Sequence, residues 1–228
     1  MTSAAVGVQE SPQTDMHLNF IREYYLDDIG LCDKLLNLFQ TARRLGFTGP
    51  GRTGNFQVNK KIKDSEDLAV ESLPPNHPEL PGPDASGFNA VMRQFVDFIP
   101  RYYTDVDAAW RQDVEFKNLP HFQYYKPGGG YHAWHTDAAG GSVNRHLVFL
   151  LYLNDVPGGG TEFKGHDYVC EAKKGKVLMF PANFCYPHRS QISETHEKYI
   201  LTGWATPAQP RQPAPGVRPM PGMAPGRR

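Results

Sequence analysis

The sequence is poor in cysteine, has no long apolar run and carries no net charge. Its three cysteines, Cys32, Cys170 and Cys185, are widely spaced and form no Cys-x-x-Cys pair. This pattern predicts the reduced thiols of an intracellular protein and excludes a disulfide framework. No apolar run approaches the ~20 residues of a membrane span, and residues 1–16 lack the basic start and apolar core of a signal peptide. We therefore expect a cytoplasmic protein with no membrane partner.

The charge balance argues against a nucleic-acid partner. The chain has 24 lysines and arginines and 24 aspartates and glutamates, so that no overall field attracts a polyanion. Its mass of 25.6 kDa over 228 residues suits one domain with tails. The composition leaves the oligomeric state open.

Both ends of the chain are predicted to be disordered tails. Residues 1–16 are small and polar, with no periodicity. Residues 205–228 contain seven of the chain's 20 prolines, and such a segment buries too little apolar surface to offset the entropy lost on ordering. We place the boundaries of the tails at 1–16 and 207–228.

Residues 17–116 are predicted to form a strand and supporting helices. The strand covers residues 18–26. Asp27 or Asp28 is then placed to cap a helix whose apolar face comprises Ile29, Cys32, Leu35, Leu36 and Phe39. A polar loop follows from Gly46. A second helix is expected from Ser86, and Pro100 should kink or end it; its apolar face comprises Phe88, Val91, Met92, Phe95 and Ile99.

Residues 117–206 are predicted to form short strands separated by glycine turns. The near-continuous apolar run 146–153 is typical of a strand buried on both faces. The turns are 128–130 and 158–160, and the other expected strands are 122–125, 131–137, 161–163, 177–180, 188–192 and 199–204. Strands that follow a helical first part indicate an α+β protein with a double-stranded β-helix (jelly-roll) core and N-terminal helices packed on one sheet.

A His-x-Asp step and a distant histidine are the candidate metal ligands. In a strand, residues i and i+2 point to the same side, so that His135 and Asp137 reach one ion. His188 follows 53 residues after His135 and supplies a third ligand from another strand. Two imidazoles and one carboxylate can occupy one face of an iron(II) ion and leave the opposite positions open. The other seven histidines are expected in loops, on the surface or, for His132 and His146, in packing or in support of the site.

Residues 120–206 resemble the prolyl 4-hydroxylase branch of the 2-oxoglutarate/iron(II) oxygenases. The likeness rests on the order of several short stretches over some 85 residues, which makes it specific. These stretches are 124–128, 130–137, 145–155, 159–163, 174–180, His188 and 198–204. One spacing departs from the collagen-modifying members: Tyr131 lies four residues before His135 instead of three, with Trp134 in the extra place. This departure affects the prediction of the substrate more than the prediction of the metal site.

The resemblance implies a role for each matched residue. His135, Asp137 and His188 would bind Fe(II) and form the catalytic centre. Lys198 would pair with the far carboxylate of 2-oxoglutarate. Four further residues would form the cosubstrate pocket: Tyr152 as a donor to the same carboxylate, Tyr125 along the cosubstrate, and Thr202 and Trp204 beside Lys198. Tyr125, Tyr152 and Trp204 have an alternative role as aromatic residues of the sheet core.

The implied activity is that of a 2-oxoglutarate-dependent dioxygenase. Such an enzyme would consume 2-oxoglutarate and O2, release succinate and CO2, and hydroxylate an aliphatic C–H bond, with ascorbate as a candidate reductant. The leading hypothesis is a prolyl 4-hydroxylase-type reaction on a peptidyl residue. Two alternatives stay open: a hydroxylase of a free amino acid or other small molecule, and a non-catalytic metal-binding jelly roll. Lys198 counts against the last, because a bare metal site does not require it.

Overall fold

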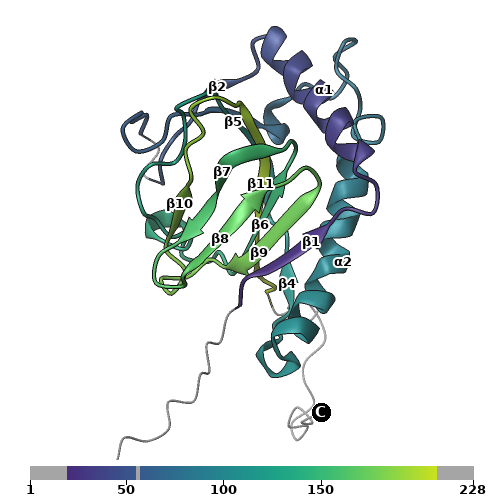
Figure 1. Cartoon of the computed structure of the whole chain (residues 1–228). Helices are drawn as coiled ribbons and strands as arrows, with labels where there is room; N and C mark the ends of the chain where they lie inside the picture. The colour runs from purple at the N-terminus through teal and green to yellow at the C-terminus, as the bar shows by residue number, and fades with distance from the viewer. Residues whose placement is uncertain (1–19, 55–56, 210–228) are drawn as a thin grey trace, which may run out of the picture.

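The computed structural model describes residues 20–54 and 57–209 (Figure 1). The tails expected at 1–16 and 207–228 lie outside the described residues, apart from 207–209. Within the described part, no helix has both the length and the apolar character that crossing a membrane requires. All three cysteines are free, as the sequence predicts.

The described strands form two antiparallel sheets. The larger sheet contains β1 (Arg22–Tyr25), β2 (Gly49–Pro50), β3 (Glu66–Ala69), β4 (Val114–Glu115), β5 (His121–Tyr125), β6 (Leu147–Tyr152), β9 (Lys176–Pro181) and β11 (Lys198–Pro207). Its order is β1-β9-β6-β11-β5-β3-β2, with β4 paired to β11. The smaller sheet has the order β10-β7-β8 and consists of β7 (Val156–Phe163), β8 (Tyr168–Ala172) and β10 (His188–Ser190). The fold is therefore mostly β.

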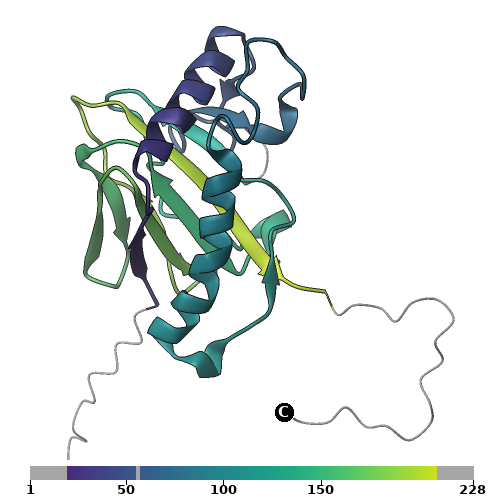
Figure 2. The same cartoon turned by 90° about the vertical axis from the view of Figure 1, so that its right-hand side faces the viewer.

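Two helices, α1 (Gly30–Arg44) and α2 (Phe88–Val106), lie along the same side of the molecule (Figures 1 and 2). Each forms because its apolar residues recur at a spacing of three or four and so share one face. The buried residues are Leu31, Cys32, Leu35, Leu38, Phe39 and Ala42 in α1, and Phe88, Val91, Phe95, Phe98, Tyr102 and Tyr103 in α2. Three short 3-10 segments, Val70–Ser72, Ala108–Trp110 and Gly140–Ser142, complete the elements of the described part.

The predicted helices are confirmed, with corrections at their ends. Ile29 was expected in the apolar face of α1, but it precedes the helix and is 55% exposed. The expected carboxylate cap is also absent: Asp28 Oδ1 accepts a hydrogen bond from the Gly30 amide, while Ile29 occupies the N-cap position. Pro100 does not end α2, which continues to Val106.

The larger sheet separates two apolar layers because successive side chains in a strand point to opposite faces. In β6, Phe149 and Leu151 face the helices, whereas Val148 and Leu150 face the smaller sheet. All six residues of β6 are buried, as the apolar run predicts. The helix layer is rich in ring contacts, for example between Phe95 and Phe149, whose centroids lie 5.3 Å apart.

Several strands of the structure were not expected from the sequence. β3 pairs with β5 and β2 with β3, so the segment expected to be a polar loop extends the larger sheet. β8 was not expected either. Residues 158–160, expected as a turn, lie inside β7 at a register shift. A Cβ at Gly160 would stand 1.9 Å from the carbonyl oxygen of Cys170, which explains the glycine there.

The expected strand over residues 131–137 is reduced to two isolated bridges. Tyr131 pairs with Lys63, and His135 pairs with His188. The segment is extended at these points without forming a continuous ladder. These two bridges are nevertheless sufficient to position the candidate ligands.

Phe149→Ala should destabilise the fold by about 3–5 kcal/mol, because it removes a fully buried ring from between the sheet and the helices. Urea unfolding followed by circular dichroism measures the change. Val143→Ala, at a position that is 65% exposed, is the control and should change stability by less than about 0.5 kcal/mol. A loss below 1 kcal/mol for Phe149→Ala would contradict this account of the core.

Candidate metal centre and its chamber

A cavity of ≈ 760 Å³, here called the chamber, lies on the face of the larger sheet opposite the helices. Both sheets contribute to its wall, since Thr161 comes from β7 and His188 from β10. All eight site residues expected from the sequence line it: His135, Asp137, His188, Tyr125, Tyr152, Lys198, Thr202 and Trp204. The chain thus brings together residues that are up to 79 positions apart in the sequence.

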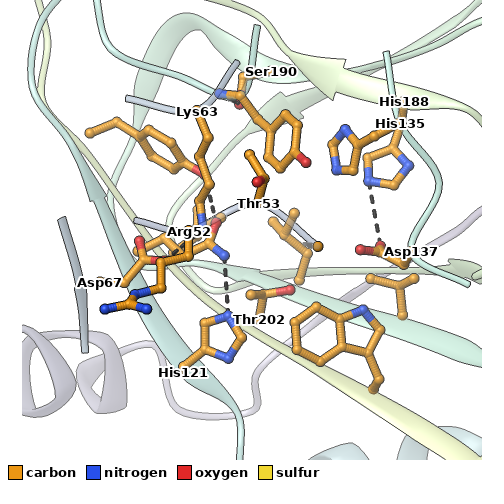
Figure 3. A pocket seen from close by; sticks show the side chains of 18 of the residues that line it. Arg52, Thr53, Lys63, Asp67, His121, His135, Asp137, His188, Ser190 and Thr202 are labelled. Atoms are coloured by element: carbon orange, nitrogen blue, oxygen red, sulfur yellow. Dashed lines mark hydrogen bonds and ion pairs between the residues drawn. The ribbon is translucent and has the colours of Figure 1, made fainter. Parts of the chain in front are cut away.

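The three candidate ligands converge at one side of the chamber (Figure 3). His135, Asp137 and His188 each offer a ligand atom, and these atoms lie within 4.8 Å of one another. His188 Nε2 is 3.5 Å from Asp137 Oδ2. Two imidazoles and one carboxylate at this separation fit a divalent transition metal such as iron(II).

Backbone carbonyls orient both imidazole rings. His135 Nδ1 lies 3.2 Å from the Ala133 oxygen, and His188 Nδ1 lies 3.1 Å from the Tyr186 oxygen. When Nδ1–H of each ring donates to its carbonyl, Nε2 carries the free lone pair that a metal ion requires. Burial lowers the pKa of His135 to about 4, and the neighbouring His188 adds to this effect, so that the ring of His135 is neutral at pH 7.

Asp137 and His135 are each held from a second side. The Arg145 guanidinium approaches Asp137, with 3.8 Å between Nη1 and Oδ1, and lies 3.4 Å above the Trp204 ring. Tyr131 stacks on His135 with ring centroids 3.5 Å apart. These contacts fix the side chains that would bind the ion.

Lys198 is a buried cation in the same chamber. It is 4% exposed, and its ammonium donates to the Gly159 oxygen at 2.8 Å and to the Gln191 oxygen at 3.3 Å. Its Nζ also lies 5.1 Å from the centroid of the Tyr125 ring. Burial lowers the pKa of Lys198 to about 7. An ammonium desolvated in this way gains strongly from an anionic ligand.

Hydroxyl groups line the same chamber as Lys198. Tyr152 is 1% exposed, and its hydroxyl is 2.7 Å from Thr161 Oγ1. Thr202, on the same face of β11 as Lys198, is 5% exposed. The Trp204 indole Nε1 is the one buried side-chain nitrogen or oxygen of the described residues that lacks a hydrogen-bond partner. The chamber wall therefore combines a cation with several hydroxyl groups.

A row of polar residues on β5 was missed from the sequence. His121, Gln123 and Tyr125 alternate along the strand, and all three line the chamber. The Tyr125 hydroxyl donates to Gln123 Oε1 at 2.6 Å, and Gln123 Nε2 lies 3.3 Å from His121 Nε2. Burial lowers the pKa of His121 to about 4, so that its ring is neutral and accepts from the amide. His121 and Gln123 could have been predicted from the sequence, because they lie four and two residues before Tyr125 and so share its face of the strand.

The expectations for the other histidines are mixed. His121 was expected in a loop or on the surface, and this was wrong, because it lies on β5 in the chamber. His146 has the packing role expected of it: its Nε2 lies 2.9 Å from the Tyr103 hydroxyl on α2. Lys63 and Asp67 also line the chamber and were not expected there.

Solved prolyl hydroxylases have a similar fold. A prolyl hydroxylase from Trichoplax adhaerens, in complex with a hypoxia inducible factor oxygen degradation domain peptide fragment, superposes with a TM-score of 0.66 at 14% identity, covering 83% of this chain and 84% of that one. A prolyl-4-hydroxylase from Pseudomonas putida gives 0.59 at 20% identity, covering 82% and 92%. The viral collagen prolyl hydroxylase of Paramecium Bursaria Chlorella virus-1, in its 2OG complex, gives 0.59 at 17% identity, covering 83% and 97%.

One segment in the second half of the chain matches a known family model. Residues 120–206 match the model of the 2OG-Fe(II) oxygenase superfamily, and no curated protein matches the chain. Residues 120–206 are therefore similar to a 2OG-Fe(II) oxygenase domain, and the fold of the chain is similar to that of prolyl hydroxylases. The cofactors of this family are Fe(II), 2-oxoglutarate and O2, and the convergent His-Asp-His group fits the iron.

Gln123→Leu should destabilise the fold by about 1–3 kcal/mol. Tyr125 is buried, with 2% of its surface exposed, and its hydroxyl would lose its hydrogen-bond acceptor. Tyr125→Phe should cost a similar amount by leaving Gln123 Oε1 unpaired. The loss of stability in the double variant should be smaller than the sum of the two single losses, by about 0.5–3 kcal/mol. Urea unfolding of the three variants measures this coupling, and strict additivity would contradict the hydrogen bond.

Proposed function

We propose that the chain is an iron(II)- and 2-oxoglutarate-dependent hydroxylase acting on a peptidyl proline or a similar aliphatic residue. The observation that carries the proposal is a three-residue metal centre that shares one chamber with a buried lysine. A bare metal-binding module has no use for Lys198. The similar fold of three prolyl hydroxylases, one of them in complex with a peptide, supports this substrate class.

His135, Asp137 and His188 would hold the iron. The carbonyls of Ala133 and Tyr186 keep Nε2 of each imidazole available for the ion. The carboxylate of Asp137 adds one negative charge, and Arg145 restrains it. Iron(II) bound here, together with 2-oxoglutarate and O2, supplies the oxidising chemistry, and the protein supplies position and exclusion of water.

Lys198 would bind the carboxylate of 2-oxoglutarate that is remote from the metal. Lysine offers a compact charge there in place of the planar fork of an arginine. The Tyr152 and Thr202 hydroxyls would donate to the same group, the Tyr125 ring would lie along the cosubstrate, and Trp204 would form the wall. Because Tyr125 already donates its hydroxyl to Gln123, it would contribute its ring face to the cosubstrate rather than a hydrogen bond.

The net reaction balances with one substrate C–H bond. 2-Oxoglutarate, O2 and R–H give succinate, CO2 and R–OH, so that one oxygen atom enters each organic product. Ascorbate, as a reductant that keeps the metal ferrous, and a cytoplasmic location both stay predictions.

A second candidate is a hydroxylase of a free amino acid or another small acid. It is favoured by the charged residues Lys63 and Asp67 in the chamber wall. Consumption of 2-oxoglutarate in the presence of prolyl peptides and of free amino acids, measured side by side, separates the two candidates. Stimulation by free amino acids alone would reject the peptidyl assignment.

Purified protein supplied with iron(II), ascorbate and 2-oxoglutarate should release succinate. Asp137→Ala should reduce this release to below about 1% of the wild-type rate, because even the loss of a residue that merely supports a ligand costs about 10- to 100-fold. Asp113→Ala, at an exposed aspartate, is the matched control and should keep the wild-type rate. Unchanged turnover by Asp137→Ala would reject the metal centre.

The affinity for 2-oxoglutarate should fall as the pH rises above 7. Burial lowers the pKa of Lys198 to about 7 in the free protein, and a bound carboxylate favours the charged ammonium and raises that pKa in the complex. Below pH 7 the ammonium is already charged and the affinity is at its maximum. Above it, binding must take up a proton, so that Kd rises by about tenfold per pH unit until the pKa of the complex is reached.

Anaerobic calorimetry of the iron-loaded protein between pH 6.5 and 9, in two buffers of different protonation enthalpy, measures both Kd and proton uptake. Lys198→Arg is the control, because a guanidinium stays charged over this range and its Kd should not follow the pH. A wild-type Kd that is constant across the range would contradict the role of Lys198.

A further inference from the structure

Part of the chamber wall comes from residues that precede the oxygenase domain. Ten of its lining residues lie between Phe47 and Ser72, before the matched segment 120–206. Figure 3 shows Lys63 and Asp67 at the far end of the chamber, across from the His-Asp-His group. A cavity of ≈ 760 Å³ is larger than a five-carbon diacid needs and is in the usual range for a drug-sized ligand. The far end is therefore the space left for a substrate.

Lys63 is buried at this end and has more N–H donors than hydrogen-bond acceptors. The residue is 4% exposed, and within the described part of the chain its ammonium has one partner, Asp67 Oδ2, at 2.6 Å. An ammonium has three N–H donors, so that two of them have no acceptor among the described residues, and Lys63 lines the chamber. Buried polar groups normally have partners, and an unfilled one is costly. The two open donors point to a ligand that brings its own oxygen atoms.

The position of Lys63 is fixed before any ligand arrives. Its backbone pairs with Tyr131, and Asp67 is held in turn by the Ser65 hydroxyl at 2.7 Å. The backbone at Gly51 packs directly on this group: a Cβ there would stand 2.0 Å from Ser65 Oγ and 3.1 Å from Lys63 Cε. Preorganisation of this kind lowers the entropic cost of binding.

The charges of the wall favour an anion. Its lining includes five cationic side chains, Arg52, Lys63, Arg145, Arg189 and Lys198, against two carboxylates, Asp67 and Asp137. Asp137 belongs to the metal centre, where the ion adds further positive charge. A cavity lined mainly by one sign of charge raises the local concentration of the opposite ion.

We propose that the substrate carries a carboxylate that binds Lys63, at the end of the chamber opposite the metal. This proposal rests on the proposed function, since it names a substrate group for the same site. The carboxylate has two sources: the α-carboxylate of a free amino acid, or an acidic side chain next to the target residue of a peptide. In both cases the carboxylate oxygens accept the two open N–H groups, and Asp67 keeps the third.

Two pairs of probes test the proposal, each an acid and its neutral amide. One pair is L-proline and L-prolinamide. The other is a blocked peptide with aspartate next to proline and the same peptide with asparagine. Binding is titrated onto protein loaded with Mn(II) and the unreactive cosubstrate analogue N-oxalylglycine, so that the readout does not depend on turnover. At least one acid should bind about 10-fold or more tighter than its amide, as expected for a charge-assisted contact.

Lys63→Met should reduce this preference to less than about twofold, and Lys63→Arg should retain most of it. Lys61→Met is the matched control, because Lys61 is exposed and lies two residues away; it should keep the wild-type preference. A preference in the proline pair alone assigns the carboxylate to a free amino acid, and one in the peptide pair alone assigns it to a peptide side chain.

Equal binding of acid and amide in both pairs, or binding of no probe, would overturn the proposal without recourse to any variant. If Lys63→Met also lost 2-oxoglutarate binding, Lys63 would be a structural residue and the proposal would fall. Failure of the proposed function gives a different result: the wild type would then release no succinate from 2-oxoglutarate, whatever the acid-to-amide preference.

Discussion

The main chains of His135 and His188 are hydrogen-bonded to each other in both directions, and the site depends on this contact. The His135 amide donates to the His188 oxygen at 3.1 Å, and the His188 amide donates to the His135 oxygen at 2.9 Å. The pair joins the segment after β5 to the edge of the smaller sheet. It thereby places two imidazoles, 53 residues apart in the sequence, with ring centroids 4.3 Å apart. Asp137 follows at the next same-side position, so a single backbone contact brings the three candidate ligands together.

Because side chains alternate along each strand, the larger sheet has an apolar face toward the helices and a partly polar face toward the chamber. Phe122 and Tyr124 of β5 pack in the helix layer, while His121, Gln123 and Tyr125 face the chamber. The helices need only apolar partners, so their side of each strand is uniform. The chamber side can then carry polar residues, provided that they satisfy one another, as Tyr125 and Gln123 do. The sheet tolerates a charged cavity because its other face supplies the apolar core.

The sequence was sufficient for residues whose chemistry is tied to a local pattern. The His-x-Asp step, His188 and Lys198 stand in an ordered series of short motifs, and all the residues expected from that series line the chamber. Lys63 and Asp67 lie outside that series of motifs. They lie in a polar stretch that is typical of a loop, and only the pairing of β3 with β5 turns Asp67 toward the chamber. β2 has two residues, too few to show any periodicity. β7 contains glycines that are typical of a turn, but the strand pairs with β8. In each case tertiary pairing decided a structure that local propensity does not encode.

The same division explains why the family does not determine the substrate. The residues that would hold iron and 2-oxoglutarate all lie within 120–206, the segment that matches the superfamily. Lys63 and Asp67, at the far end of the chamber, precede that segment. At 14–20% identity, the similarity to solved prolyl hydroxylases concerns the fold. A buried ammonium with open donors constrains a ligand more tightly than a shared fold does, because its desolvation has to be offset by a group of matching charge. If the proposal is right, the substrate is selected by the group that accepts the hydrogen bonds of Lys63, outside the segment that matches the superfamily.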